Sequence, residues 1–525
     1  MNPVEVEIYR HLFQSIAEEA GIVLRTTAFS ANIKERLDFS CAVIDDRGDM
    51  AAQASHIPVH LGSCHLTAKL LLETIDFAPG DVVILNDPFR GGTHLPDVTL
   101  FAPIFVKGRK APFFGVLTRA HHADVGGGVP GSMGSFDEIY KEGIILPPVK
   151  IVARGAIVRD VLEVFLANVR TPDERRGDIA AQIAATRRGT VRLEEMMARY
   201  GAATCAKAAE ALKARAASAV AAIIKTLPRG VFRFADSLDG PGTPKIAVAI
   251  AARGGKLTVD FAGSDPMMKG ALNANEAVTL SSVFYALRCL AEESIPTNSG
   301  CLRPVRVLIP PGTIVGARRP AAVAGGNVET SQRIVDVVFG ALAKALPGRI
   351  PAASQGTMNS LSFGGRGPDG PFTYYETIAG GIGASASGPG ASGLHSHMTN
   401  TLNTPIEALE RQYPVRVRAY RLRDHSGGAG LEPGGDGVRR EIEALVPMTA
   451  TILSTRRQTA PYGSAGGAPG SPGRNTVIQK GRVRTIAATA TVELAPGDVI
   501  RIETPGGGYG SAPKKSAARS RSRRR

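Results

Sequence analysis

The chain has 525 residues, 43% hydrophobic and 21% charged, which is an ordinary globular balance in a chain too long for one core, so two or three domains are expected. The net charge of +15 does not indicate a nucleic-acid-binding protein, because residues 514–525 alone carry seven lysines and arginines and aromatic side chains make up only 5% of the chain. No uninterrupted apolar run approaches the ~18–20 residues of a membrane span, which excludes a helical membrane protein.

The two ends of the chain and its cysteines indicate where in the cell the protein is expected. The first residues, MNPVEVEIYRHLF, carry acidic side chains and lead into no apolar segment, so no secretory signal is expected. The five cysteines are widely spaced without a CxxC pair, which indicates buried, reduced thiols in a cytoplasmic protein. Residues 512–525 are basic, contain serine and lack apolar side chains, so we expect a disordered tail that keeps the chain soluble without a specific partner.

Helix-like and strand-like patterns alternate in the first part of the chain. The predicted elements are, in order, an amphipathic helix at 3–24, a hairpin at 39–53 with its turn at 46–49, a helix at 66–75 and buried strands at 82–85 and 99–105. The segment APFFGVLTRAHHAD then predicts a strand whose alternation puts Arg119 and His121 on one face and His122 on the other.

The second half of the chain has a different character. Residues 171–227 have a helical pattern that ends at a Pro-Arg-Gly turn, which we take as the best domain boundary. Strands with tight turns follow, then a helix around 281–293, and glycine-rich segments from 350 to 510 flank good strands, as functional or packing loops. We therefore predict a multidomain, mixed α+β fold. A metal-site domain with a helical end is expected at residues 1–228, and a β-rich domain with substrate or partner loops at 229–511.

Side chains suited to metal binding are concentrated between residues 30 and 128. Neutral imidazoles and carboxylates from several short segments are the usual ligands of a first-row divalent metal. Six of the ten histidines and four aspartates fall here: His56, His60, His65, His94, His121, His122, Asp38, Asp87, Asp97 and Asp124. No GxxxxGK[ST] loop occurs, and no GxGxxG convincingly opens a helix after a strand, so the chain shows no phosphate-binding loop of its own.

An ordered series of motifs runs through nearly the whole chain, including ERLDFS, HIPVHLGS, NDPFRGGTHLPDVTL, RAHHADVGG, PAAVAGGNVETSQRI, YYETIAGG, HSHMTNTLNTPIEALE and TPGGGYG. In this series the chain resembles the B-type subunit of the hydantoinase/oxoprolinase family, from about residue 3 to residue 510. The resemblance implies an ATP-dependent complex in which an A-type subunit with an actin-like ATP-binding fold activates a cyclic amide. The B-type subunit would carry a metal and complete hydrolysis of a hydantoin, 5-oxoproline or a lactam.

The same resemblance implies four metal ligands: Asp38 of ERLDFS, His94 and Asp97 of HLPD, and His121 of HHAD. The residues themselves agree, since His94 and Asp97 flank a proline turn and can converge, and His121 shares a strand face with Arg119. Two carboxylates and two imidazoles suit Mn, Fe(II), Co or Zn with a position open for water. Such a metal would polarise a carbonyl or supply hydroxide near neutral pH.

Two further residues, His122 and Asp124, are predicted to orient the ligands by hydrogen bonds and to affect catalysis in this way. For His122, a core histidine without a role at the site is an equal alternative. His395 and His397 lie near the reaction centre in the resemblance, or else hold a glycine-rich loop in place. Weaker candidates remain at the site, in a turn or on a solvated helix start: His60, Glu35, Asp87, Asn327, Glu329, Thr330, Asn400, Asn403, Arg170, Arg175 and Arg176.

Four functions remain open from the sequence, the weakest being a nucleic-acid-binding protein, which only the basic tail supports. The first is the metal-dependent hydrolytic subunit of an ATP-dependent cyclic amide hydrolase, working as a hetero-oligomer with an A-type subunit that uses the ATP. The second is a subunit of an acetone-carboxylase-like enzyme, although such subunits are usually longer. The third is a non-catalytic scaffold for the A-type subunit, which the nearly complete ligand set disfavours. No membrane partner is expected.

Overall fold

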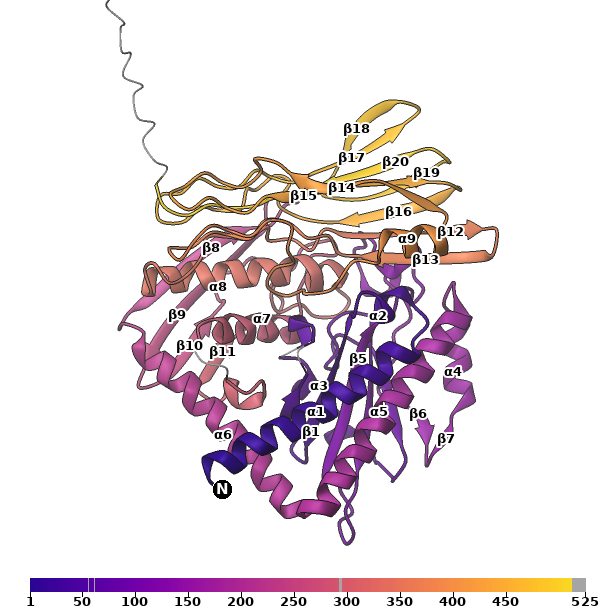
Figure 1. Ribbon diagram of the computed structural model, residues 1–525, viewed down its shortest axis with the longest axis vertical. Coiled ribbons are helices and arrows are strands. Elements are labelled where there is room, and N and C mark those ends of the chain that lie inside the picture. Colours follow the sequence, from indigo (N-terminus) through magenta and orange to yellow (C-terminus); the bar gives the residue numbers. More distant parts are fainter. Residues whose placement is uncertain (55, 61, 292–294, 512–525) are drawn as a thin grey trace, which may run out of the picture.

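The computed structural model describes residues 1–54, 56–60, 62–291 and 295–511. In these residues four β-sheets are packed with helices between and beside them. The first and second sheets lie in the lower half of the molecule in Figure 1, and the third and fourth in the upper half. Within the described residues, no helix has both the length and the apolar character to cross a membrane.

The first sheet comes wholly from the N-terminal part of the chain and is antiparallel throughout. Its order is β2-β1-β5-β4-β3-β6-β7. The strands are β1 Phe39–Asp45, β2 Met50–Gln53, β3 Val82–Leu85, β4 Asp97–Ile104, β5 Phe114–His121, β6 Val149–Ala153 and β7 Ala156–Ile157. Because successive side chains alternate between the two faces, each face of this sheet has its own set of partners.

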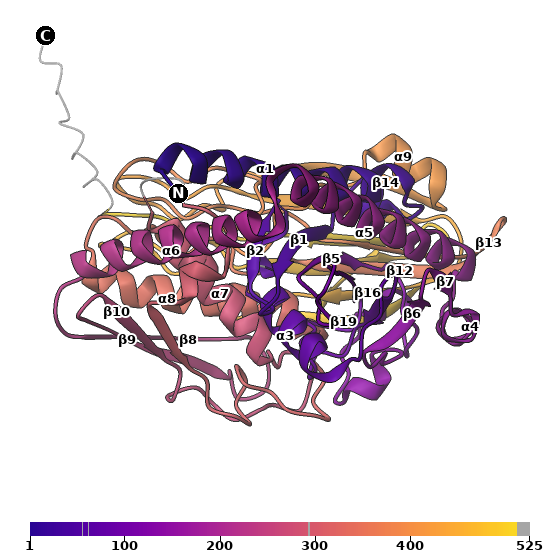
Figure 2. The ribbon, with the colours of Figure 1, turned by 90° about the horizontal axis from the view of Figure 1, so that it is seen from below.

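One face of the first sheet is covered by two long helices, α1 Pro3–Thr27 and α5 Pro172–Tyr200 (Figure 2). Helix α1 begins where Asn2 and Glu5 form a reciprocal capping box around a proline at the first helical position, so the otherwise unpaired N–H groups of the first turn gain acceptors. On this face Phe39 and Ala120 pack against the small residues of the two helices. The opposite face carries the predicted metal ligands.

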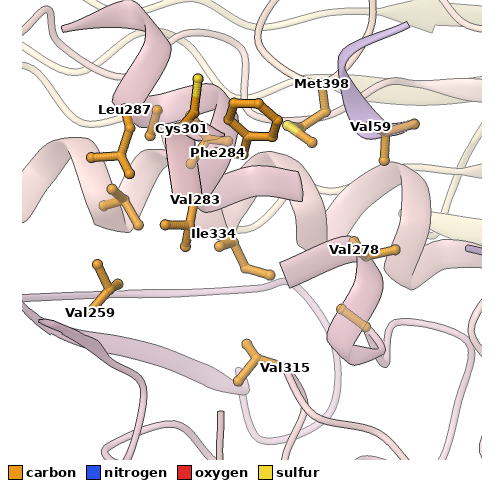
Figure 3. Packing of buried hydrophobic residues seen from close by; sticks show 14 of the residues in the cluster. Val59, Val259, Val278, Val283, Phe284, Leu287, Cys301, Val315, Ile334 and Met398 are labelled. Carbon is orange, nitrogen blue, oxygen red and sulfur yellow. The ribbon is translucent and has the colours of Figure 1, made fainter. Parts of the chain in front are cut away.

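The second sheet has the order β11-β10-β9-β8 and lies at the left of Figure 1, beside helices α7 and α8. Its strands are β8 Val231–Ser237, β9 Lys245–Arg253, β10 Lys256–Asp260 and β11 Val305–Leu308. The helices packed with it are α6 Ala202–Thr226, α7 Glu276–Cys289 and α8 Ser331–Ala345. Figure 3 shows the resulting core, in which Val59 from the N-terminal part and Met398 from the C-terminal part reach the same cluster as α7.

The third and fourth sheets form the upper half of the molecule in Figure 1 and share one hydrophobic cluster, to which Phe363 and Ile442 belong. The third has the order β13-β12-β16-β19 and the fourth β14-β15-β20-β17-β18. Their strands are β12 Ser360–Gly367, β13 Gly370–Glu376, β14 Val415–Arg423, β15 Gly437–Ala444, β16 Met448–Leu453, β17 Arg474–Gln479, β18 Arg482–Ile486, β19 Thr489–Leu494 and β20 Val499–Glu503.

The remaining elements are short. They are α2 Ala31–Lys34, α3 Cys64–Thr74, α4 Arg159–Leu166, α9 Ile406–Gln412, the 3₁₀ turns Pro58–His60, Pro130–Ser132, Ile139–Lys141 and Ser299–Leu302, and the π-helical turn Gly326–Thr330.

The glycine-rich segments of the C-terminal half lie beside one another as hydrogen-bonded backbone. Gly381 donates to the carbonyl of Pro505 at 2.8 Å, and Gly435 to that of Ile382 at 2.9 Å. A Cβ at Gly470 would lie 0.6 Å from the carbonyl oxygen of Gly506, so only glycine permits this approach. Of the two roles expected for these segments, packing is the one that their contacts support.

The predicted mixed α+β architecture is confirmed, with elements close to the expected ranges. The helical stretch 171–227 is two helices, α5 and α6, joined at Gly201, which has a positive φ of 84°. The helix expected around 281–293 ends at Cys289, and residues 292 and 293 lie outside the described part, as does the tail 512–525. The boundary at residue 228 stays a prediction, since one core cluster draws residues from both sides of it.

All five cysteines are free thiols, as expected, but only four are buried. Cys289, the last residue of α7, is exposed. The expectation of five buried thiols is therefore wrong at this position.

Candidate metal centre

Three of the four predicted ligands lie in a row across neighbouring strands of the first sheet. His121 at the end of β5 pairs with Asp97 at the start of β4. On the other side the His121 N–H donates to the carbonyl of Asp38, the residue before β1, at 3.0 Å. Residues directly opposite one another on neighbouring strands point to the same face, so sheet register brings these segments together.

The fourth predicted ligand, His94, comes from the loop before β4. Its Nε2 lies 3.1 Å from Asp97 Oδ1, and His121 Nδ1 lies 3.5 Å from the same oxygen. The ligand atoms of these three residues all lie within 4.8 Å of one another, and each residue is at most 2% exposed. Among the described residues, no other group of three histidines, cysteines or acidic residues is arranged in this way.

The donor atoms of this group fit a bound divalent ion. Neither ring nitrogen of His94 nor Nε2 of His121 has a hydrogen-bond partner within the described residues, although buried polar atoms are nearly always paired. His94 Nε2 is close to Asp97 but outside hydrogen-bond geometry. Nitrogen and oxygen ligands that share one ion at ~2.0–2.2 Å lie about 3–3.5 Å apart, and the two distances to Asp97 Oδ1, 3.1 Å from His94 Nε2 and 3.5 Å from His121 Nδ1, fall in this range.

A third histidine, His60, hydrogen-bonds the other oxygen of the Asp97 carboxylate. Asp97 Oδ2 accepts hydrogen bonds from Thr93 Oγ1 and from His60 Nε2 at 3.3 Å, and His60 Nδ1 in turn lies 2.8 Å from Ser40 Oγ. Burial alone would raise the pKa of Asp97, but the imidazoles of His94, His60 and His121 together lower it well below its usual range. Asp97 is therefore an ionised acceptor, and His60 Nε2 must carry the proton.

Asp38 borders the group without joining it. Its carboxylate lies 3.7 Å from Arg36 Nη1, and it is not one of the three residues whose ligand atoms converge. Arg36 is fully buried, so its charge attracts this carboxylate in a setting of low dielectric. As the fourth ligand, Asp38 remains a proposal that needs its side chain to turn from Arg36 toward His121.

A tyrosine from the C-terminal half packs on the candidate ligand His121. The rings of Tyr375 and His121 are stacked at 4.4 Å between centroids with 12° between their planes. The Arg36 guanidinium lies 4.9 Å from the Tyr375 ring centroid and donates to the Tyr375 carbonyl at 2.9 Å. Tyr375 and Arg36 had no predicted role, because nothing in the local sequence shows that β13 meets the end of β5.

The loop that carries His94 is clamped from two sides. Arg119, on the same strand face as His121, donates to the Gly91 carbonyl of the loop at 3.3 Å, and its bond to Thr99 Oγ1 at 2.8 Å agrees with the predicted face. Asn275 caps α7 and also donates to carbonyls of the loop, including that of Thr93 at 3.0 Å. Both side chains are fully or almost fully buried, so the loop is held rigidly before any ligand binds.

His122 and Asp124 are not placed as predicted. The His122 ring points to the helix-covered face, where Nε2 lies 2.9 Å from Gln182 Oε1 of α5, and burial lowers its pKa to about 4. Asp124 accepts from the backbone and the guanidinium of Arg170 at 2.7 and 2.8 Å. Neither side chain hydrogen-bonds a ligand in the described structure. The strand alternation that directs His121 to the ligand face directs His122 away from it, and only the His122 backbone N–H supports the HLPD turn, through Pro96.

The weaker candidates divide by location. Asp87 caps its own turn through the Phe89 N–H at 3.0 Å and pairs with Arg319. Arg175 was expected at a solvated helix start, but it is fully buried between Glu174 and Asp178, whereas Arg176 is exposed. Glu35 is half-buried and makes no contact with the ligand group in the described residues.

Most candidate residues of the C-terminal half form hydrogen bonds within the fold. Glu329 accepts from the Met358 N–H at 3.1 Å and from Thr455 Oγ1 at 2.9 Å, and burial raises its pKa to about 7. Asn403 donates to Glu376 at 3.0 Å. The others contact backbone or line a cavity: Thr330 bonds the Leu272 carbonyl, Asn400 that of His56, Asn327 keeps an unpaired Oδ1, and His395 and His397 line a cavity.

The chain belongs to the hydantoinase B/oxoprolinase family, whose model matches residues 2–512. It is 41% identical to an uncharacterized protein of Methanocaldococcus jannaschii, over 97% of this chain and 91% of that protein. It is 40% identical to 5-oxoprolinase 1 of Arabidopsis thaliana over 97% of this chain but only 42% of that protein, so it spans about two fifths of this relative. A putative B-type subunit of a D-/L-hydantoinase, from Pseudomonas sp. strain NS671, is 29% identical over 97% of this chain and 90% of its own length.

Two solved structures share the fold. The ATP-dependent caprolactamase from Pseudomonas jessenii superposes with a TM-score of 0.90 and 27% identity, covering 98% of this chain and 92% of that one. A nucleotide-free acetone carboxylase superposes with a TM-score of 0.89 over 97% of this chain and 76% of that one, and its 19% identity supports similarity of fold alone.

Proposed function

We propose that this chain is the metal-dependent hydrolytic subunit of an ATP-dependent cyclic amide hydrolase. It would open a hydantoin, 5-oxoproline or lactam ring that an ATP-using A-type partner has activated, in a hetero-oligomer with that partner. The observation that carries the proposal is the buried group of His94, Asp97 and His121, in which three of the four imidazole nitrogens lack partners in the described structure.

The residues of the centre suit Mn, Zn, Fe(II) or Co, since imidazole and carboxylate ligands are common to these ions. His94, Asp97 and His121 would hold the ion, and Asp38 would join as a fourth ligand. When bound, such an ion supplies Lewis acidity toward a carbonyl or a water. His60 and Thr93 keep Asp97 oriented and ionised, and the hydrogen bonds of Arg119 and Asn275 to the loop carbonyls of Gly91 and Thr93 keep the His94 loop in place.

The need for a partner follows from what the sequence lacks. No GxxxxGK[ST] motif occurs among the 525 residues, so this chain shows no recognisable cradle for the phosphates of ATP. The relative named as one subunit of a hydantoinase and the caprolactamase described as ATP-dependent agree with a division of labour between two chains or domains. A purely structural role would not require the three converging ligands to be retained.

The proposal is tested by mixing the metal-loaded chain with an A-type subunit, ATP and 5-oxoproline, hydantoin or caprolactam. We expect ring opening only when both chains are present, with oxygen from labelled water in the product carboxylate and no need for bicarbonate. Ring opening with ATP by this chain alone would contradict the division of labour. Strict dependence on bicarbonate, with labelled carbon entering the product, would instead show a carboxylase of the acetone carboxylase kind.

A further inference from the structure

One arginine, Arg36, is fully enclosed where the N-terminal and C-terminal parts of the chain meet beside the candidate metal centre. Its Nη1 donates to the Tyr375 carbonyl at 2.9 Å, and its Nη2 donates to Thr377 Oγ1 at 3.1 Å and to Thr401 Oγ1 at 3.4 Å. All three acceptors are neutral oxygens, so these bonds hold the guanidinium in place without neutralising its charge. A buried charge of this kind is costly unless a charge of opposite sign lies close to it.

The counter-ion of Arg36 is Asp38. Among the described residues, Asp38 is the only acidic side chain within 4.0 Å of the Arg36 guanidinium, and its carboxylate lies 3.7 Å from Nη1. This separation is longer than a hydrogen bond, and Arg36 Nε has no hydrogen-bond partner in the same part of the chain. The two groups are therefore paired by charge alone, and Asp38 can leave Arg36 without breaking a hydrogen bond between them.

The backbone of both residues is fixed, so a change of partner needs only a side-chain rotation. The Arg36 carbonyl accepts from the Leu402 N–H at 3.0 Å, and the Asp38 carbonyl accepts from the His121 N–H at 3.0 Å. Leu37 between them has a φ of +57°, in the left-handed region that non-glycine residues rarely adopt. Strained backbone of this kind persists where the surrounding structure determines the position of the neighbouring side chains, as it does at ligand sites.

Tyr375 connects this pair with the candidate ligands. The Arg36 guanidinium lies 4.9 Å from the Tyr375 ring centroid, and the same ring is stacked on His121 at 4.4 Å. Asp38 is 7% exposed, whereas the three residues of the converging group are at most 2% exposed. Of the four candidate ligands, Asp38 is therefore the one whose side chain is least enclosed and rotates at the lowest cost in packing.

Electrostatics decides which partner Asp38 takes. A divalent ion carries twice the charge of a guanidinium and lies only ~2.0–2.2 Å from a ligand oxygen, so it attracts the carboxylate more strongly than Arg36 does at 3.7 Å. Arg36 still opposes the binding of the ion, because it holds the carboxylate back and because its own positive charge is buried beside the centre. Both effects lower the affinity of the centre for a metal.

We propose that Arg36 is a positioning residue, which holds Asp38 away from the converging group in the metal-free chain and gives it up when a divalent ion binds. The inference rests on the metal centre of the proposed function and adds a residue that is not itself a ligand. Its consequence is a centre in which Asp38 joins last, and whose metal affinity is set by the Arg36–Asp38 pair.

The test uses the full purified chain, stripped of metal with a chelator and titrated with Zn²⁺ against a competing indicator. Arg36→Met removes the charge and keeps a side chain of similar length on Tyr375, and it should tighten Zn²⁺ binding roughly tenfold, the lower end of the effects seen for groups that hold a metal ligand. Arg36→Gln, a second neutral variant, should show the same gain. Arg36→Lys keeps the charge and should stay within about threefold of the unchanged chain.

Two comparisons isolate the role of the pair. When Asp38→Asn is already present, Arg36→Met should change Zn²⁺ affinity by less than about threefold, because no carboxylate remains to be released. Arg456→Met is the matched control: Arg456 is also fully buried, but it pairs with Asp336 and Asp236 at 2.7 and 2.8 Å, and its substitution should leave Zn²⁺ affinity unchanged. Urea unfolding of each metal-free variant separates a loss of stability from a change in affinity.

Unchanged or weaker Zn²⁺ binding in the neutral Arg36 variants would overturn the proposal, because Arg36 would then only support the fold. A gain of equal size with Asp38→Asn present would overturn it as well, since repulsion between charges would account for the whole effect. Zn²⁺ binding is measured without ATP or a cyclic amide, so a failure of ring opening beside the expected gain would refute the hydrolase and leave the role of Arg36 standing.

Discussion

The two buried histidines His60 and His122 give a matched pair for testing the metal centre. Both are at most 1% exposed, and each ring makes hydrogen bonds on its own face of the first sheet. His60 holds Asp97, whereas His122 contacts Gln182 on the helix-covered face. We predict that His60→Ala weakens metal binding and that His122→Ala does not.

The expected size of the effect follows from the contacts. Removing a hydrogen-bond partner of a ligand typically lowers metal affinity 10–100-fold, or about 1.4–2.7 kcal/mol at 25 °C. His60→Ala also leaves Ser40 Oγ without its imidazole partner, so the upper half of that range is expected. For His122→Ala the change should be less than about threefold, because no ligand atom loses a hydrogen bond.

The assay strips each variant with a chelator, then titrates Zn²⁺ or Mn²⁺ against a competing indicator and measures bound metal by elemental analysis. Urea unfolding of the metal-free variants is the control, since both substitutions remove a buried ring and should destabilise the fold to a similar extent. If His122→Ala weakened metal binding as much as His60→Ala, the assignment of the two strand faces would be refuted.

Other predictions follow from the same geometry. His94→Ala, Asp97→Ala, His121→Ala and Asp38→Ala should each sharply reduce bound metal; full metal binding in Asp38→Ala would remove this residue, which lies outside the converging group, from the proposed ligands. Tyr375→Leu removes the ring stacked on His121 and should lower metal affinity about 10-fold, with Tyr374→Leu, whose ring packs on Phe363, as the control without effect. The free energy of unfolding of the metal-free chain should fall as pH falls from about 6.5 to 4. Burial lowers the pKa of His56, His65, His122 and His395 to about 4, so the unfolded chain binds protons at a higher pH than the folded chain does. Urea denaturation that gives the same free energy across this pH range would contradict the prediction.

The alternation of side chains along the sequence was sufficient to predict which face of a strand each residue occupies. The alternation of β5 put Arg119 and His121 on one face and His122 on the other, and the hydrogen bonds of all three follow it. The same alternation argues against the expected role of His122 in orienting the ligands, because successive residues of a strand point to opposite faces. The sequence motif HHAD alone does not show this, since two adjacent histidines suggest two partners in one site.

Contacts between distant segments could not be inferred in the same way. The stack of Tyr375 on His121 and the Asn275 clamp on the Thr93 carbonyl depend on how the halves of the molecule pack, not on any local period. Both bring residues of the later chain onto a centre whose ligands all lie between residues 38 and 121. The centre is therefore complete only in the folded whole: its candidate ligands come from the first sheet and the loop before β4, while β13 restrains His121 and α7 adds a second restraint on the His94 loop.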